Sequence, residues 1–130
     1  LAALVAFDKE KSMVENVMAM REQAKAARSA ACSIAVRDSV VNGIKVKKDQ
    51  YIGLVEEKIV CAGDQLLEVA SETLRLAAEG AELISIYYGK DMPVEQAEEL
   101  VDELKKINGD WEIELFDGGQ PLYPLLMVIE

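Results

Sequence analysis

Histidine is absent from this chain of 130 residues, and cysteine occurs only twice. Histidine is the usual general base near neutral pH and the usual partner of serine and cysteine nucleophiles, so self-contained hydrolase chemistry is not expected. Cys32 and Cys61 lie in separate apolar runs without a Cys-x-x-Cys motif, and we expect both to be buried, reduced thiols. Two thiolates cannot supply the four ligands of a structural zinc site. We therefore expect no catalytic, cofactor-binding or metal-binding residue in this chain.

Long apolar runs and an excess of basic residues are also missing. No apolar run approaches the roughly 20 residues that cross a bilayer, and residues 1–7 lack the cationic start and the length of a signal peptide. Acidic residues outnumber basic ones by 24 to 14, which gives a net charge of −10. This charge argues against binding to nucleic acid or to an anionic membrane surface. We expect a cytoplasmic protein.

Phosphate-binding loops are absent as well. There is no Gly-x-x-x-x-Gly-Lys-Ser/Thr loop, no Gly-x-Gly-x-x-Gly and no kinase catalytic loop. The pair Gly118-Gly119 precedes a predicted strand, whereas the phosphate loops of nucleotide-binding proteins precede a helix. ATP binding by this chain alone is therefore not expected.

The length and the 51% hydrophobic content fit one domain, residues 1–130. The chain starts without methionine, at an apolar segment that has no helix cap, so we expect a piece of a longer polypeptide. Apolar spacing predicts helices that begin near Ser12, Asp64 and Asp91, and strands at 30–36, 83–88, 111–116 and 122–129. Hairpins are predicted at 40–46, where Asn42-Gly43 favours a type I′ turn, and at 51–61.

This order of elements predicts an α/β fold. We expect a mixed, partly parallel sheet flanked by about three helices, with a small β-hairpin insertion near residues 40–61. The pairing between 83 and 116 should be parallel, and the last strand should pair antiparallel with a neighbour or leave the sheet. Asp64 is expected to cap the second helix. The third helix should bury a stripe that comprises Val94, Ala97, Val101 and Leu104.

Polar residues follow three of the predicted strands and define a candidate binding rim. They are Arg37-Asp38, residues 89–91 and residues 117–120, and open α/β sheets bind ligands at such strand ends. Arg37-Asp38 is open to two interpretations, an ion pair that closes the strand or a contact with an anion or partner. Gly118, Gly119 and Pro121 predict a sharp structural turn. The acidic face of the third helix is interpreted as a solvated surface.

Six short blocks occur along the chain and carry a family resemblance. They are Ala-Phe-Asp at 6–8, Asn16 with Met20, Ser-Ile-Ala-Val-Arg-Asp at 33–38, Tyr-Ile-Gly at 51–53, Tyr-Gly-Lys-Asp at 88–91 and Asp-Gly-Gly-Gln-Pro-Leu-Tyr-Pro at 117–124. Together they resemble the C-terminal region of bacterial fatty acid kinase catalytic subunits, long proteins of the dihydroxyacetone-kinase-like, DhaL-domain family. The chain departs from the expected pattern at Asp49, in place of glycine, and at Glu56-Glu57, in place of Asp-Gly.

The resemblance implies that different domains of a kinase carry out nucleotide binding and partner binding. In that family an N-terminal DhaL-like domain binds ATP and magnesium, and the C-terminal region is implicated in engaging a separate fatty-acid-binding protein of the DegV family. We therefore expect a non-catalytic docking domain that works with that partner and with other domains of the same polypeptide. The candidate partner-binding residues on the rim are Arg37, Asp38, Tyr88, Asp117, Gln120 and Tyr123.

Two other functions stay open at this point. The rim aspartates Asp38, Asp91 and Asp117 could serve a metal-dependent phosphatase or another small-molecule enzyme. Alternatively, the domain could be a dimerisation scaffold, in which case a homodimer is expected.

Overall fold

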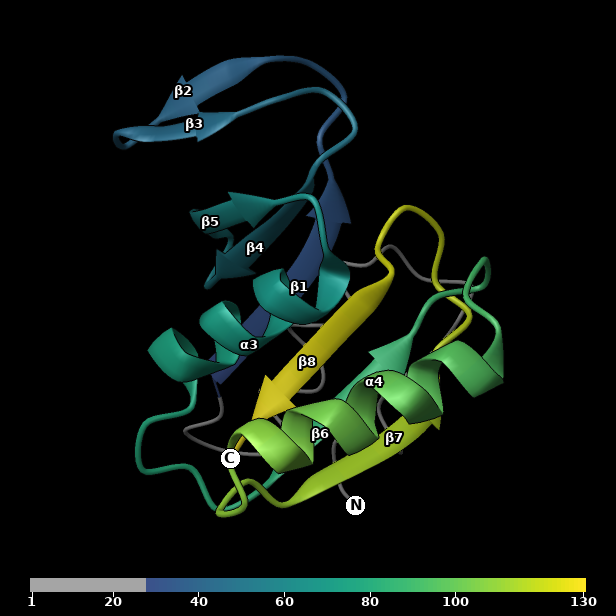
Figure 1. Ribbon diagram of the computed structural model, residues 1–130. Helices are drawn as coiled ribbons and strands as arrows, with labels where there is room; N and C mark the ends of the chain where they lie inside the picture. Colours follow the sequence, from purple (N-terminus) through teal and green to yellow (C-terminus); the bar gives the residue numbers. More distant parts are fainter. Residues whose placement is uncertain (1–27) are drawn as a thin grey trace.

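The computed structural model describes residues 28–130, which form two sheets and two helices (Figure 1). The main sheet has six strands in the order β5-β4-β1-β8-β6-β7, and β2 and β3 form a separate two-stranded sheet. The elements are β1 (Arg28–Ile34), β2 (Ser39–Val41), β3 (Ile44–Val46), β4 (Tyr51–Val55), β5 (Lys58–Gly63), α3 (Leu66–Ala77), β6 (Ile84–Tyr88), α4 (Val94–Ile107), β7 (Ile113–Asp117) and β8 (Leu125–Ile129). The predicted mixed α/β fold is confirmed. The helix predicted after Ser12 lies outside the described residues.

The last strand in the sequence occupies the centre of the sheet. β8 pairs antiparallel with β1 on one side and with β6 on the other, and β6 pairs parallel with the edge strand β7. The predicted parallel pair and the antiparallel final strand are both confirmed. All five residues of β8 are at most 1% exposed. A strand that is buried on both faces reads as a continuous apolar run, which explains why Leu-Leu-Met-Val-Ile shows no alternation.

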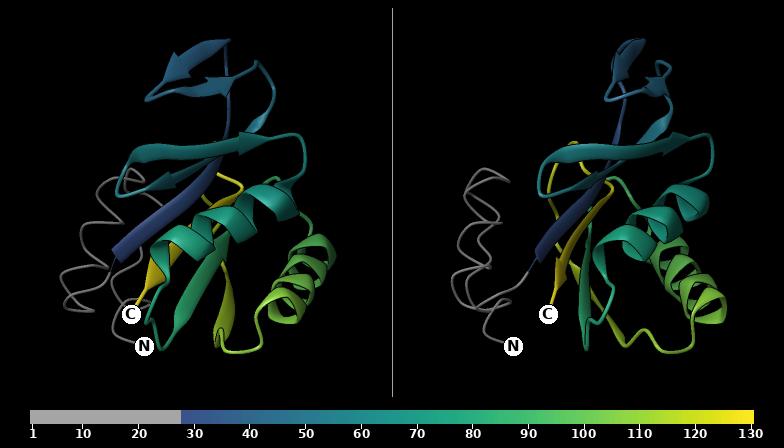
Figure 2. Two further views of the ribbon diagram at one scale, coloured as in Figure 1. Left: turned by 60° about the vertical axis from the view of Figure 1, so that its left-hand side comes forward. Right: turned by 90° about the vertical axis from the view of Figure 1, so that its left-hand side faces the viewer.

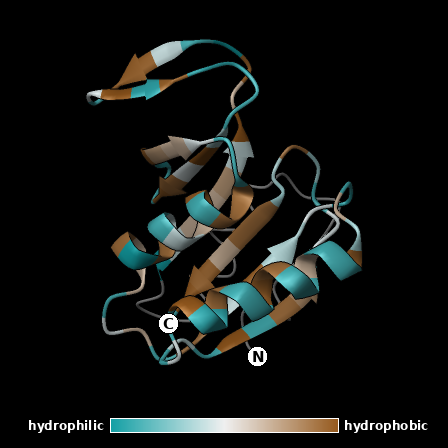
Figure 3. Cartoon of the chain, in the orientation of Figure 1, coloured by the Kyte–Doolittle hydropathy of each residue, from teal (hydrophilic) through white to brown (hydrophobic). Residues whose placement is uncertain are grey.

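Both helices cover the same face of the sheet (Figure 2). Residues from β1, β6 and β8 that point to this face form the core with the buried sides of α3 and α4. Apolar residues are concentrated on these strands, and polar residues on the outer side of α4 (Figure 3). Burial of this apolar surface is the main force that holds the layers together. Within residues 28–130, no helix has the length and apolarity needed to span a membrane.

The two predicted hairpins have different structural roles. β4 and β5 extend the main sheet through the β1–β4 pairing, so they belong to it, and only β2–β3 stands apart from it. The β2–β3 turn has φ values of 51° at Asn42 and 79° at Gly43, which agrees with the predicted type I′ turn. The expectation of one β insertion across 40–61 therefore holds for its first half only.

Two details of the predicted helices are wrong. Gln65 occupies the N-cap position of α3 without a side-chain cap, because the Asp64 carboxylate instead accepts a hydrogen bond from Gln50 Nε2 at 3.0 Å. In α4, Val94 is 40% exposed, since it is the first helical residue and lies beyond the packed surface. Leu100 is buried in addition to the rest of the predicted stripe.

The turn between β4 and β5 predicts a simple stabilising substitution. Glu56 and Glu57 have φ values of 50° and 69°, a left-handed conformation that costs about 1–2 kcal/mol for a residue with a Cβ. Glu57→Gly should raise the free energy of unfolding by about 0.5–1 kcal/mol in urea titrations. Glu56→Gly is the matched control. It relieves the same strain but loses the side-chain contacts with Ser29, so its gain should be smaller. A lower stability for Glu57→Gly would contradict this assignment of strain.

Candidate functional site

The segment from Asp117 to Pro124, which we call the corner, is fastened to the end of β6. The N–H groups of Gly118 and Gly119 both donate to the Tyr88 carbonyl, at 3.0 and 3.2 Å. In the other direction, Gly89 N–H donates to Pro124 O at 2.9 Å, and Lys90 N–H donates to Gln120 O at 3.1 Å. The corner is therefore a fixed element of the fold.

Close contacts explain two glycines of this region, one with backbone and one with side chains. A Cβ on Gly89 would lie 2.6 Å from the Tyr123 carbonyl oxygen, and a Cβ on Gly118 would lie 2.0 Å from Gln120 Oε1. Neither distance is sterically allowed, so both positions require glycine. Both glycines thus allow close packing at the end of β6.

Gln120 is the side chain that holds the corner together. It is 4% exposed, and its Nε2 donates to the Tyr87 carbonyl at 2.9 Å and to the Tyr123 carbonyl at 3.0 Å. One amide thereby joins β6 to the far side of the corner. Buried carbonyl groups that lose their donor destabilise a fold, so this residue has a structural role.

Leu122, at the tip of the corner, is both strained and exposed. Its φ is 69°, and Tyr123 N–H donates across it to Pro121 O at 2.8 Å, which describes a γ-turn of the strained, positive-φ form. The leucine side chain is nevertheless 80% exposed and gains almost no burial in return. Residues in such conformations cluster at functional sites, because nothing in packing alone favours them.

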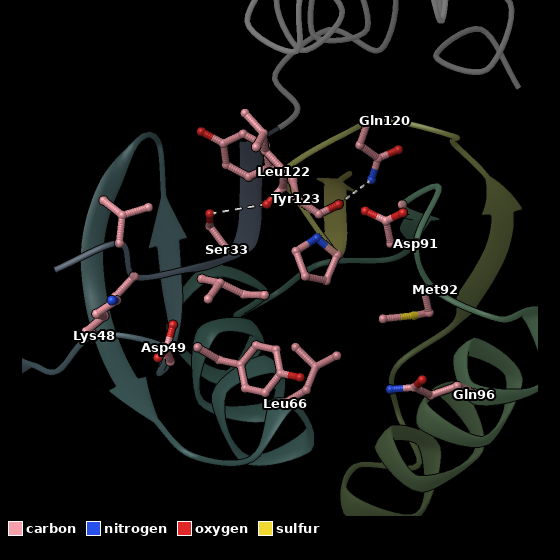
Figure 4. Close-up of a pocket in the computed structure, with 16 residues that line it drawn as sticks. Ser33, Lys48, Asp49, Leu66, Asp91, Met92, Gln96, Gln120, Leu122 and Tyr123 are labelled. Carbon is pink, nitrogen blue, oxygen red and sulfur yellow. Dashed lines mark hydrogen bonds between the residues drawn. The ribbon is translucent and has the colours of Figure 1, made fainter.

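The corner forms one wall of a cleft of about 670 Å³ (Figure 4). The other walls come from the end of β1, the segment before β4, the start of α3, and the β6–α4 connection with the first turn of α4. The lining residues are Ser33, Ile34, Ala35, Val36, Lys48, Asp49, Tyr51, Leu66, Gly89, Asp91, Met92, Gln96, Gln120, Leu122, Tyr123 and Pro124. The predicted rim is thus hollowed where it meets the carboxyl end of β1.

Apolar side chains dominate the exposed margin of the cleft. Val36 is 83% exposed, Leu122 80% and Ile34 44%, and these three residues come from opposite walls. Charged groups are interspersed, with Lys48 and Asp49 on the wall that carries Val36 and Asp91 at the start of the α4 region. An apolar surface ringed by separated charges is typical of a protein-binding site.

Within residues 28–130, no three cysteine, aspartate or glutamate side chains gather as metal ligands. Ser33 Oγ donates a hydrogen bond to the Leu122 carbonyl at 3.5 Å, and a carbonyl oxygen is not a general base. The cleft can therefore hold and orient a ligand or a protein segment through shape, apolar contact and charge.

The six predicted rim residues are distributed unequally around the cleft. Gln120 and Tyr123 line it, whereas Arg37, Asp38 and Asp117 are exposed outside it. Tyr88 is half-buried and packs against the core on the helix-covered face. Partial burial and the nearby Asp117 carboxylate raise the pKa of Tyr88.

Asp38 has a structural partner that the sequence did not indicate. Its Oδ1 accepts a hydrogen bond from the Lys48 backbone N–H at 2.8 Å, which ties the two ends of the β2–β3 hairpin together. The ion pair considered for Arg37-Asp38 is not among the ion pairs of residues 28–130. Of the three aspartates of the enzymatic alternative, only Asp91 lines the cleft.

Sequence reasoning missed the apolar residues that define the cleft margin. The apolar pattern places Val36 in a buried strand and Leu122 at the start of the last one, although both are exposed. A leucine between two prolines in a polar turn was the available signal for Leu122. Asp49 has a φ of 72°, which explains why glycine was expected there.

The two cysteines do not form a redox pair. Cys32 and Cys61 each pair with Gly53 from opposite sides, so two strand spacings, about 9.5 Å, separate their backbones. A disulfide requires Cα atoms within about 7 Å, and both cysteines are free. Burial raises the pKa of the Cys32 thiol and also of the Cys61 thiol. The predicted burial is correct for Cys32, whereas Cys61 is half-buried.

Removal of the Gln120 amide should destabilise the domain. Gln120→Ala leaves the Tyr87 and Tyr123 carbonyls without their donor, so we expect the free energy of unfolding to fall by about 2 kcal/mol or more in urea titrations. Gln96→Ala is the control, because Gln96 lines the same cleft but is exposed. Its effect should stay within about 0.5 kcal/mol. Equal effects of the two substitutions would contradict the structural role of Gln120.

Comparison with known proteins assigns the chain to a family. The family model for the FakA-like C-terminal domain of fatty acid kinase matches residues 1–130. Uncharacterized proteins of Staphylococcus aureus strains bovine RF122 / ET3-1 and USA300 are each 30% identical to the chain over 131 residues, a match that covers 100% of this chain and 24% of each relative. The chain thus spans about a quarter of the length of these curated relatives. It belongs to the FakA-like family of fatty acid kinase C-terminal domains.

Proposed function

We propose that this domain is a non-catalytic docking module of a fatty acid kinase. Its cleft binds a separate fatty-acid-binding protein of the DegV family and holds the acyl carboxylate toward a kinase site elsewhere in the polypeptide. ATP and magnesium are bound there, in a DhaL-like N-terminal domain. The observation that carries the proposal is Leu122, a strained and exposed leucine at the margin of an apolar cleft.

The energetics of Leu122 favour a binding role. Its conformation costs about 1–2 kcal/mol in the free domain, and its side chain contributes little to the core because it is 80% exposed. A partner that covers the leucine recovers about 1.5–3 kcal/mol from its burial. The hydrogen bonds of the corner fix the backbone at Leu122 beforehand, so little backbone entropy is lost on binding.

The remaining margin of the cleft is suited to complete such an interface. Val36 contributes apolar surface from the opposite wall, and the Tyr123 ring, half-buried on the corner, is the type of residue enriched at interface hot spots. Lys48, Asp49 and Asp91 supply separated charges of both signs around the apolar centre. Such a ring of charges selects among partners of similar shape.

The enzymatic alternative has less support. Asp38 is engaged at the base of the hairpin, and Asp117 lies outside the cleft, so the carboxylates needed for metal-dependent hydrolysis do not converge among residues 28–130. In the docking proposal, another part of the polypeptide phosphorylates the carboxylate.

Two substitutions of Leu122 separate binding from stability. Leu122→Ala and Leu122→Gly should each weaken binding of the fatty-acid-loaded DegV-family protein from the same organism by at least about tenfold in titration calorimetry. Leu122→Gly should at the same time raise the free energy of unfolding, because glycine relieves the strain at φ 69°. Ile107→Ala is the control, since Ile107 is also exposed, at 56%, but lies at the far end of α4.

Three outcomes would contradict the proposal. One is the absence of binding by the unsubstituted protein, and another is equal affinity for the Leu122 and Ile107 variants. The third is a concentration-dependent dimer in sedimentation that both Leu122 variants abolish, which would assign the cleft to self-association.

A further inference from the structure

The segment 36–48, which we call the arm, projects beyond the sheet and has a charge opposite to that of the chain (Figure 1). It consists of β2, β3 and their flanking residues. The arm contains four basic residues and one acidic residue, so it carries a net charge of +3 in a chain of −10. The basic residues are Arg37, Lys45, Lys47 and Lys48, and the acidic residue is Asp38. The rest of the chain therefore carries −13. The arm is thus a cationic projection on an acidic chain.

Contacts at its base and on one side hold the arm in a defined orientation. Asp49 N–H donates to Ala35 O at 2.9 Å, and Ala35 N–H donates to Gln50 O at 2.8 Å. The bond from Lys48 N–H to Asp38 closes the same neck at 2.8 Å. Farther along, Val46 is 3% exposed, so the arm is packed rather than freely hinged. The backbone that carries its cations is consequently held in place.

The outward face of the arm combines charge with apolar surface. Val40 and Lys45 are directly opposite in the hairpin register and both are exposed, Val40 at 68%. Their neighbours in the strands, Val41 and Ile44, form a pair that is half-buried on the other face. Among the ion pairs of residues 28–130, none involves the four basic residues of the arm. Their charge is thus available to a partner.

We infer that the arm steers an acidic patch of the docking partner toward the cleft. The inference rests on the proposed function, because Val36 and Lys48 belong both to the arm and to the cleft wall. The arm and the cleft therefore form one continuous surface. Separated charges at the border of an interface mainly set the association rate, whereas buried apolar residues mainly set the dissociation rate. The arm raises the association rate of the partner, and Leu122 lowers its dissociation rate.

An acidic patch on a protein fits the arm better than an extended polyanion does. Nucleic acid and anionic membranes present charge over large distances, so they would also meet the −13 of the body and be repelled. A compact patch can contact the projecting arm alone, and Val40 supplies the apolar contact typical of protein interfaces. A second copy of the chain is also acidic, at −10, and the test below separates it from the DegV-family protein.

Stopped-flow association kinetics with the fatty-acid-loaded DegV-family protein test this inference. Lys45→Glu/Lys47→Glu in the complete kinase polypeptide should slow association at least about fivefold at roughly 50 mM ionic strength, with little change in the dissociation rate. The difference should nearly vanish at about 500 mM, where charges are screened within a few ångströms. Lys58→Glu/Lys105→Glu is the matched control, because it changes the net charge equally at exposed sites outside the arm. Thermal unfolding should show that both variants stay folded.

The possible results separate the two proposals. Equal association rates for the arm variant and its control would overturn the role of the arm and leave the docking function intact. Absence of binding by the unsubstituted polypeptide at any ionic strength would overturn both. A salt-sensitive dimer, or binding of a DNA duplex, that only the arm variant loses would assign the arm to another occupant and overturn the inference.

Discussion

The route of the chain from β7 to β8 is the constraint on which the rest of the structure depends. β7 is the edge strand, and β8 lies two positions inward between β6 and β1, so the corner must cross the end of β6. It does so in close contact with this strand end: a Cβ on Gly89 would meet the Tyr123 carbonyl oxygen, and a Cβ on Gly118 would meet the Gln120 side chain. Gln120 then joins the crossing segment to β6 with two hydrogen bonds. The chain can pass from β7 into the central apolar strand β8 only by this crossing.

The same crossing creates the candidate site. Because the corner is held against β6, its tip projects over the end of β1 and encloses the cleft from one side. The left-handed conformation of Leu122 is the local cost of turning back into β8, and it leaves the leucine side chain in solvent. One topological requirement thus yields a rigid corner, a hollow beside it and an exposed apolar residue. The proposed docking role uses all three.

Local patterns were sufficient to predict the elements and the class of the fold. Spacing and turn signals located the strands and both described helices, although the predicted Asp64 cap was wrong, and the Asn42-Gly43 turn was correct in type. The central position of β8 and the joining of β4 and β5 to the main sheet were beyond prediction, because strand order depends on long-range packing. The prediction of burial was wrong for the same reason at Val36 and Leu122. Their apolar character indicated burial, but both side chains are exposed. The sequence indicated that residues 117–124 form a constrained turn. The crossing over β6 explains why this turn is needed.

Amide hydrogen exchange of the complete kinase polypeptide, with and without the fatty-acid-loaded DegV-family protein, tests the central claim most directly. If the crossing forms the docking site, the partner should protect the amides of residues 33–36, the base of the arm at 45–49, and Leu122 with Tyr123. The outer surface of α4 should exchange at an unchanged rate. Protection confined to α4 or to the β7 edge, with the corner unaffected, would contradict a docking role for the cleft.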